Sequence, residues 1–252
     1  MRKFALMLVV IAVVVSTSFG QEEPIPPRRS KAVKIGAFGG FTPGLLLMNV
    51  KPINDFLKAG GGAPLSENGV FLYGGAGAAY IMVVPNLRVG GVGMSGSIKS
   101  TSLVGNIRRD AQLTAGFGGV TIEYVVPLAE RLDISFGTMI GGGGIDILLR
   151  RSNGGNVTWN DEQRFFGATL SDPANIPANI SRKLGGKFYV FVPSFNVEYA
   201  VLGWLGLRLG VSYVGMVSPS WQTDDNYELL NVPNTINGNG VMINAGVFVG
   251  TY

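Results

Sequence analysis

The chain has 252 residues, of which 46% are hydrophobic and only 14% are charged, and it contains neither cysteine nor histidine. The missing cysteine excludes disulfides, thiolate metal sites and an acylated lipoprotein anchor, and the missing histidine removes the commonest general base and metal ligand. The formal charge of +4 falls to +2 once Arg2 and Lys3 are set aside with the acid-free first twenty residues, which is too weak for a nucleic-acid-binding face. We therefore expect no cofactor, no metal site and no nucleic-acid partner.

The first twenty residues have the three parts of a signal peptide. A basic start precedes an unbroken apolar run from Phe4 to Val15, and a short polar stretch ends in small residues at Gly20. A membrane-anchoring helix is the alternative, but a run of 12 residues is shorter than the ~20 that span a bilayer. We predict a cleaved signal peptide at 1–20, a Pro-rich periplasmic lead-in at 21–32 and one domain at 33–252.

Residues 33–252 contain no apolar segment suited to a membrane-spanning helix, because glycine, proline or a charge interrupts each one. The region is nevertheless very apolar for an exported chain, which favours a membrane β-barrel. Glycine is the most abundant residue, with 38 copies, and it clusters inside the strand-like runs. No helix follows these clusters, so we do not interpret them as phosphate-binding loops.

Strand-like runs alternate with connections of two sizes. Tight turns are expected at 85–86, 127–130 and 202–204. Longer connections are expected at 43–68, 102–110, 150–185 and 218–239. Short periplasmic turns and long extracellular loops are typical of transmembrane barrels. The sequence predicts an all-β, up-and-down antiparallel transmembrane β-barrel of about eight strands, at 32–42, 69–84, 87–101, 111–126, 131–149, 186–201, 205–217 and 240–252.

Side-chain alternation gives these strands an apolar outward face and a polar inward face. Six strands each send one charge inward near the turn end, namely Lys34, Arg88, Glu123, Asp133, Glu198 and Arg208. An unpaired charge in a low-dielectric lumen is costly, so three basic and three acidic residues at one level are expected to form a neutralising network. Solvated residues at the strand ends are the alternative.

The alternation changes phase at several glycine clusters, of which Gly118-Gly119 is an example. Leu113 and Phe117 precede Gly118-Gly119 on odd positions, whereas Val120 and Ile122 follow it on even positions. We interpret this change as a β-bulge, which shifts the strand by one residue.

Aromatic residues mark both membrane boundaries and two of the long loops. Those expected at the turn-end interface are Tyr80, Tyr124, Tyr199, Trp204 and Tyr252. Those expected in loops, to contact a partner or to cover the barrel mouth, are Trp159, Phe165, Phe166, Trp221 and Tyr227. In the first long loop, Leu45 to Met48 and a helix-like segment with Ile53, Phe56 and Leu57 on one face either pack on the rim or fold inward as an apolar plug.

The segment from Met242 to Tyr252 alternates apolar residues and ends on an aromatic. It resembles the terminal strand of outer-membrane barrels, which the barrel assembly machinery recognises; Phe248 and Tyr252 fit that pattern and Gly250 departs from it. Over 33–252 the chain resembles the small eight-stranded outer-membrane proteins, which act as adhesins, narrow channels, envelope stabilisers or lipid-modifying enzymes. The resemblance implies an outer-membrane location and contact with outer-membrane lipid.

The sequence favours a structural or binding barrel over an enzyme. Enzymes of the resembled class rely on histidine, and the acidic pairs Asp161-Glu162 and Asp224-Asp225 are interpreted as solvated loop residues. We expect no catalytic residues, a narrow or charge-plugged lumen, and loops that contact a partner. A narrow channel or binding barrel for small apolar molecules is the alternative, and a secreted Gly-rich structural subunit is a third.

Overall fold

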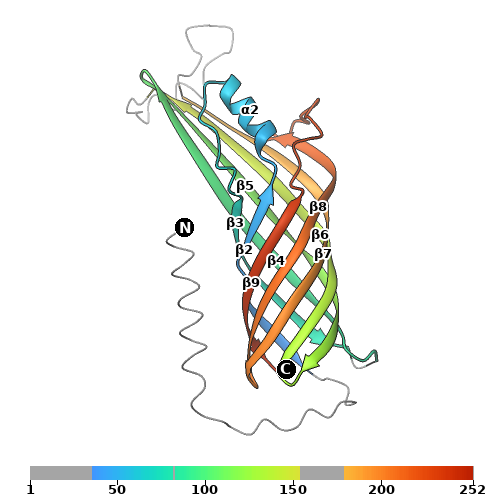
Figure 1. Ribbon diagram of the computed structural model, residues 1–252. Helices are drawn as coiled ribbons and strands as arrows, with labels where there is room; N and C mark the ends of the chain where they lie inside the picture. The colour runs from blue at the N-terminus through green and yellow to red at the C-terminus, as the bar shows by residue number, and fades with distance from the viewer. Residues whose placement is uncertain (1–35, 82, 154–178, 252) are drawn as a thin grey trace, which may run out of the picture.

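The computed structural model describes residues 36–81, 83–153 and 179–251. The predicted signal peptide and lead-in lie outside these residues, as do Lys34, Trp159, Phe165, Phe166 and Tyr252. Within them, one helix, α2 (Lys51–Ala59), accompanies nine strands (Figure 1). The strands are β1 (Ala37–Phe41), β2 (Gly44–Met48), β3 (Val70–Tyr80), β4 (Leu87–Val104), β5 (Ile107–Ala129), β6 (Leu132–Ser152), β7 (Ile180–Leu202), β8 (Leu205–Thr223) and β9 (Gly240–Gly250).

The strands close into an antiparallel ring with eight positions. β3 pairs with β4, each following strand pairs with the next, and β9 pairs back with both β1 and β2. β1 and β2 both lie between β3 and β9, so they form one strand position that is interrupted at Thr42-Pro43. Backbone bonds from Thr42 N to Gly74 O (2.9 Å) and from Ala245 N to Pro43 O (3.0 Å) hold the interruption in place. The predicted eight-stranded up-and-down barrel is confirmed.

Several predicted loops are strand instead. Leu45 to Met48 pair with β9 and do not form a loop or a plug. The predicted loop 102–110 is a two-residue hairpin turn, because pairing continues to Val104↔Ile107 and Gly105 takes the left-handed φ of 61° that such turns require. β6 also continues to Ser152 and β8 to Thr223. These segments were predicted as loops because they are polar. They are polar because the strands continue beyond the apolar part of the barrel, where they are exposed to solvent.

No bulge occurs at Gly118-Gly119. The pairing of β5 with β6 is unbroken from Arg108 to Pro127, and the register shifts only between Pro127 and Ala129. Leu113 (0% exposed) and Phe117 (6%) point inward in the same phase as Glu123 (5%). The bulge prediction was wrong because the lumen itself changes from polar to apolar along the strand, which exchanges the apolar face without shifting the register.

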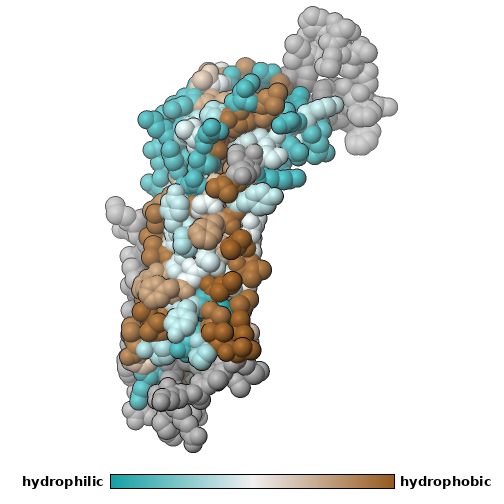
Figure 2. All heavy atoms as spheres, turned by 90° about the vertical axis from the view of Figure 1, so that its right-hand side faces the viewer, coloured by the Kyte–Doolittle hydropathy of each residue, from teal (hydrophilic) through white to brown (hydrophobic). Residues whose placement is uncertain are grey.

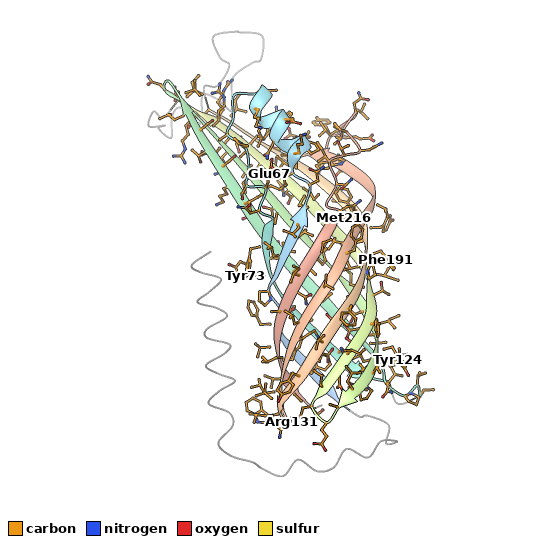
Figure 3. All side chains as sticks on the ribbon, viewed as in Figure 1. Glu67, Tyr73, Tyr124, Arg131, Phe191 and Met216 are labelled. Carbon is orange, nitrogen blue, oxygen red and sulfur yellow. The ribbon has the colours of Figure 1, made fainter. Side chains whose placement is uncertain are left out.

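An apolar belt surrounds the barrel. The side chains of Tyr124, Phe191 and Tyr73 point outward from the barrel wall (Figure 3). On the face shown in Figure 2, the lower part of the surface is largely apolar or pale, whereas the upper part is mainly hydrophilic. On β7 the outward residues run from Tyr199 to Tyr189, a length of roughly 33 Å along the strand. At a tilt of about 40° this spans about 25 Å, the height of the apolar band of a membrane barrel. Among the described residues, no helix is long and apolar enough to cross a membrane.

The helix α2 lies across the upper mouth of the barrel (Figure 1). Ile53 and Leu57 are buried in the apolar core, whereas Phe56, predicted on the same face, is 54% exposed. The buried Asn54 fixes the chain that returns from the helix, because its side chain accepts a hydrogen bond from Leu65 N (2.7 Å) and donates one to Leu65 O (3.1 Å). The helix therefore covers the lumen and does not merely rest on the rim.

Candidate functional site

Strand register brings the inward charges to one level near the lower end of the barrel. Arg88 on β4 is paired in register with Glu123 on β5, and Glu198 on β7 is paired with Arg208 on β8. Opposite residues of an antiparallel pair share a face, so all four side chains enter the lumen together. They are between 1% and 9% exposed. We call Arg88, Glu123, Glu198 and Arg208 the ionic layer.

Arg88 lies at the centre of the ionic layer. Its Nε atom donates to Glu123 Oε2 at 2.5 Å and its Nη1 atom donates to Glu198 Oε2 at 2.8 Å. Its Nη2 atom also pairs with Glu198 and donates to Ser135 Oγ at 3.2 Å. The Ser135 hydroxyl in turn donates to Glu198 Oε1 at 3.0 Å. The guanidinium is thus engaged by charged and polar partners, as a buried cation requires.

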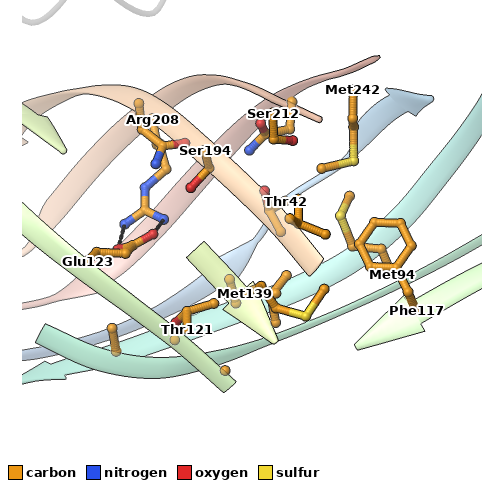
Figure 4. A pocket seen from close by; sticks show the side chains of 18 of the residues that line it. Thr42, Met94, Phe117, Thr121, Glu123, Met139, Ser194, Arg208, Ser212 and Met242 are labelled. Atoms are coloured by element: carbon orange, nitrogen blue, oxygen red, sulfur yellow. Dashed lines mark hydrogen bonds and ion pairs between the residues drawn. The ribbon is translucent and has the colours of Figure 1, made fainter. Parts of the chain in front are cut away.

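Arg208 completes the ionic layer from the opposite side. Its Nη1 atom lies 3.3 Å from Glu123 Oε1 and its Nη2 atom lies 3.1 Å from Glu198 Oε1 (Figure 4 shows the Glu123 contact). Each arginine therefore contacts both glutamates. Two positive and two negative charges cancel within the layer, and the side chains cross the lumen.

Two aromatic rings pack on the arginines. Neither ring was predicted at this site from the sequence. Phe38 on β1 and Phe248 on β9 form an edge-to-face pair with ring centroids 5.3 Å apart. Arg88 Cζ lies 4.9 Å from the Phe38 centroid, and Arg208 Cζ lies 4.7 Å from the Phe248 centroid. These cation–π contacts cover guanidinium faces whose edges bind carboxylates. Phe248 lies on the even positions of β9, which point inward.

The remaining turn-end residues are placed as follows. Asp133 is buried at the same level, opposite Glu198 in register. Tyr124, Tyr199 and Trp204 are 40% to 56% exposed on the outer surface. Tyr80 was predicted at the lipid interface, but it is paired in register with Arg88, so its ring points into the lumen. That prediction was wrong because Tyr80 shares the inward phase of Arg88, whereas Tyr124 is paired with the neighbouring Leu87 and shares its outward phase.

The even positions of the terminal strand point inward. Phe248 is 2% exposed and points inward, while Val247 and Val249 on either side are about half exposed to the outside. The outward apolar set of β9 is therefore on the odd positions.

Above the ionic layer the lumen is filled. A cavity of about 60 Å³ is lined on one side by polar groups such as Ser194 and Ser212 and on the other by Met94, Phe117 and Met139 (Figure 4). Beyond it, buried apolar side chains form a continuous core that extends to Ile53 and Leu57 of α2. The ionic layer and the apolar core thus follow one another along the lumen.

In the upper part of the barrel, the predicted loop position of Trp221 was wrong. Trp221, expected in a partner-contacting loop, lies on β8 and is only 6% exposed, with its ring 5.9 Å from the ring of Phe188 in an edge-to-face pair. Tyr227, by contrast, is 72% exposed. Among the described residues, no group of three or more histidines, cysteines, aspartates or glutamates could hold a metal ion.

Comparison with known proteins gives a likeness of architecture alone. No model of a protein family and no curated protein sequence matches the chain. Similar solved structures include Ail, the attachment invasion locus protein of Yersinia pestis, in complex with a heparin analogue (8% identity, 86% of this chain and 96% of that chain, TM-score 0.38). Others are a major outer membrane protein from Thermus thermophilus (7%, 85% and 98%, TM-score 0.42) and OprG from Pseudomonas aeruginosa (10%, 88% and 96%, TM-score 0.36). On its own closed ring and apolar belt, the chain has the fold of a small eight-stranded transmembrane β-barrel.

Proposed function

We propose that this protein is a non-conducting outer-membrane barrel that anchors a structured extracellular part for contact with a ligand or partner, and that it is not an enzyme. The observation that carries the proposal is the double closure of the lumen. The ionic layer crosses the barrel near its periplasmic end, and the apolar core fills it from Met94 up to α2. Conduction would require both to move together.

The non-enzymatic part of the proposal rests on the state of the inward carboxylates. The chain has no histidine, and Glu123 and Glu198 each contact both arginines of the ionic layer. A general base needs a free lone pair within reach of a substrate. Ion-paired carboxylates in a closed lumen offer neither, so they are suited to holding strands together.

The binding part of the proposal rests on the length of the strands. β4 to β7 have 18 to 23 residues, whereas the described β3 and β9 have 11 each. About ten residues per strand are enough to cross a membrane. The extra length carries a sheet beyond the apolar belt, where it meets α2, and gives the exposed surface a rigid support.

A channel for small apolar molecules is the second candidate, and the lining of the lumen favours it. Met94, Met139 and Met242 line the 60 Å³ cavity, and Met216 lies in the core above it. Methionine side chains are flexible and adapt to guests of different shape. This candidate requires an opening of the mouth beside α2.

Bilayer recording separates the two candidates. The purified protein is inserted into planar bilayers, and single-channel current is recorded in concentrated KCl, with a general porin as the positive control. We expect no resolved steps. The same protein in vesicles should leave the entry rate of a small apolar dye unchanged relative to empty vesicles. A stable ohmic pore would contradict the closed lumen, and faster dye entry without current would favour the apolar channel.

The terminal strand adds a proposed partner. We expect the barrel assembly machinery to recognise β9 through its outward residues Val247 and Val249, since Phe248 points into the lumen.

A further inference from the structure

A groove lies above the membrane belt, between α2 and the inner face of the projecting sheet. It has a volume of about 430 Å³, within the range of small-molecule sites. One wall is the C-terminal half of α2 and the chain that follows, and the other is formed by β4 to β7. Hydrogen bonds from Ser100 Oγ to Ala63 O (2.8 Å) and from Ser102 Oγ to Gly61 O (3.2 Å) tie the two walls together.

Four arginines line this groove, and three of them, Arg109, Arg151 and Arg182, share the inner face of adjacent strands. Arg109 on β5 is directly opposite Arg151 on β6 in the strand register. Arg151 is opposite Ile180 on β7, which places Arg182 diagonally beside it. Like charges directly opposite each other on neighbouring strands destabilise a sheet. An anion bound between Arg109 and Arg151 would offset this repulsion, because it attracts both guanidinium groups.

The groove has little negative charge of its own. Asp110, the one carboxylate among its lining residues, accepts hydrogen bonds from Arg108 Nε (3.0 Å) and from Thr101 Oγ1 (2.6 Å). Arg182 forms an ion pair with Asp225 at 3.2 Å. In the part of the chain that the structure describes, Arg109 and Arg151 have no carboxylate within ion-pair distance. Two cations therefore face the groove without a described counter-charge.

The rest of the lining is apolar. Leu57, Ala111, Leu149 and Ile180 line it, together with Phe56, which is 54% exposed. A purely ionic site would not need this surface, and a purely apolar site would not tolerate the arginines. The combination fits a ligand with an apolar body and more than one anionic group.

We propose that this groove binds an extracellular amphipathic anion that carries phosphate or sulfate groups. The apolar body lies on Leu57, Ala111 and Leu149, and Arg109 and Arg151 bind the anionic groups through bidentate hydrogen bonds. This inference deepens the proposed binding function and rests on it.

Naphthalene-1,3,6-trisulfonate is a suitable probe, because it combines an aromatic body with three anionic groups and does not partition into lipid. The full-length protein in nanodiscs of zwitterionic lipid is titrated with it by calorimetry. We expect a Kd on the order of 10 µM for a ligand of this size. The double variant Arg109→Gln/Arg151→Gln should weaken binding by at least about tenfold, and Ile180→Ser by a few-fold.

The control is Lys183→Gln. Lys183 is adjacent to Arg182 on β7 but points to the other face, where it pairs with Asp146 (3.1 Å), and neither residue lines the groove, so the variant removes a positive charge without touching the groove. We expect an unchanged Kd. Sodium sulfate alone should bind much more weakly than the trisulfonate, because it lacks the apolar body.

Two outcomes would overturn the inference: no binding of trisulfonate to the wild-type protein, or an equal loss in Lys183→Gln. Neither outcome bears on the closed lumen, which bilayer recording tests separately. A conducting wild-type protein that still binds trisulfonate through Arg109 and Arg151 would instead remove the closed barrel and leave the groove.

Discussion

Each residue of the ionic layer is held by several contacts. Each guanidinium contacts two carboxylates and each carboxylate contacts two guanidinium groups, in a space with little access to water. Removing one member of a buried ion pair leaves an uncompensated charge, which costs about 3–5 kcal/mol. An exposed ion pair contributes only about 0–1 kcal/mol, because water screens the charges.

The variant Glu198→Gln tests this difference. We expect the free energy of unfolding to fall by about 3–5 kcal/mol, because Arg88 and Arg208 then share the single carboxylate of Glu123. Urea unfolding in lipid vesicles, followed by tryptophan fluorescence, measures it. The control is Asp146→Asn, which breaks the half-exposed pair with Lys183 (3.1 Å) and should change the free energy by less than about 1 kcal/mol. Equal effects of the two variants would show that the layer is solvated.

At the scale of elements, glycines in the strands decide how closely inward side chains can pack. Gly137 on β6 is opposite Glu123 in register, and a Cβ atom there would lie 2.6 Å from Glu123 Cγ and 2.7 Å from Ile122 O. The second contact is with backbone and cannot relax by rotating a side chain. The glycine therefore gives Glu123 the space to reach the arginines.

Gly137→Ala should destabilise the barrel by about 1–3 kcal/mol, the usual range for overpacking. Gly93→Ala on β4 is the control, because nothing lies within 4 Å of a Cβ atom at that outward position. The same urea unfolding assay compares them. If both variants unfold at the wild-type urea concentration, the close approach at Gly137 does not limit packing in the lumen.

At the scale of the whole molecule, the barrel is asymmetric along its axis. The lower end has short connections, and the upper end carries α2, the projecting strands and the groove (Figure 1). The apolar belt lies between them, and residues above it are mainly hydrophilic (Figure 2). This arrangement predicts which residues contact the outside of the cell, the lipid and the periplasm.

Single cysteines test this orientation cleanly, because the chain has none of its own. A membrane-impermeant maleimide applied to intact cells should label Tyr227→Cys, which is 72% exposed at the upper end. Trp204→Cys at the lower turn should react only after the outer membrane is permeabilised. Leu209→Cys, 61% exposed within the belt, should stay unlabelled in both cases because lipid covers it. Labelling of Trp204→Cys on intact cells would invert the proposed orientation.

Alternation and turn chemistry were enough to predict the barrel, its eight strand positions and the inward phase of Arg88, Glu123, Glu198 and Arg208. These features are local, since each strand shows its own period of two. The loop boundaries were not predictable in this way, because a polar strand above the membrane and a polar loop have the same composition.

Tertiary structure alone decided what surrounds those residues. Phe38 and Phe248 join the arginines only when β1 and β9 close the ring, and Arg109 meets Arg151 only through the register of β5 with β6. In the sequence of one strand, the change from a polar to an apolar lumen has the same pattern as a bulge. It can be identified as a change of the lumen only when all strands are assembled into the ring. Local sequence determines the face on which a side chain lies, and only ring closure and register determine its neighbours across the lumen.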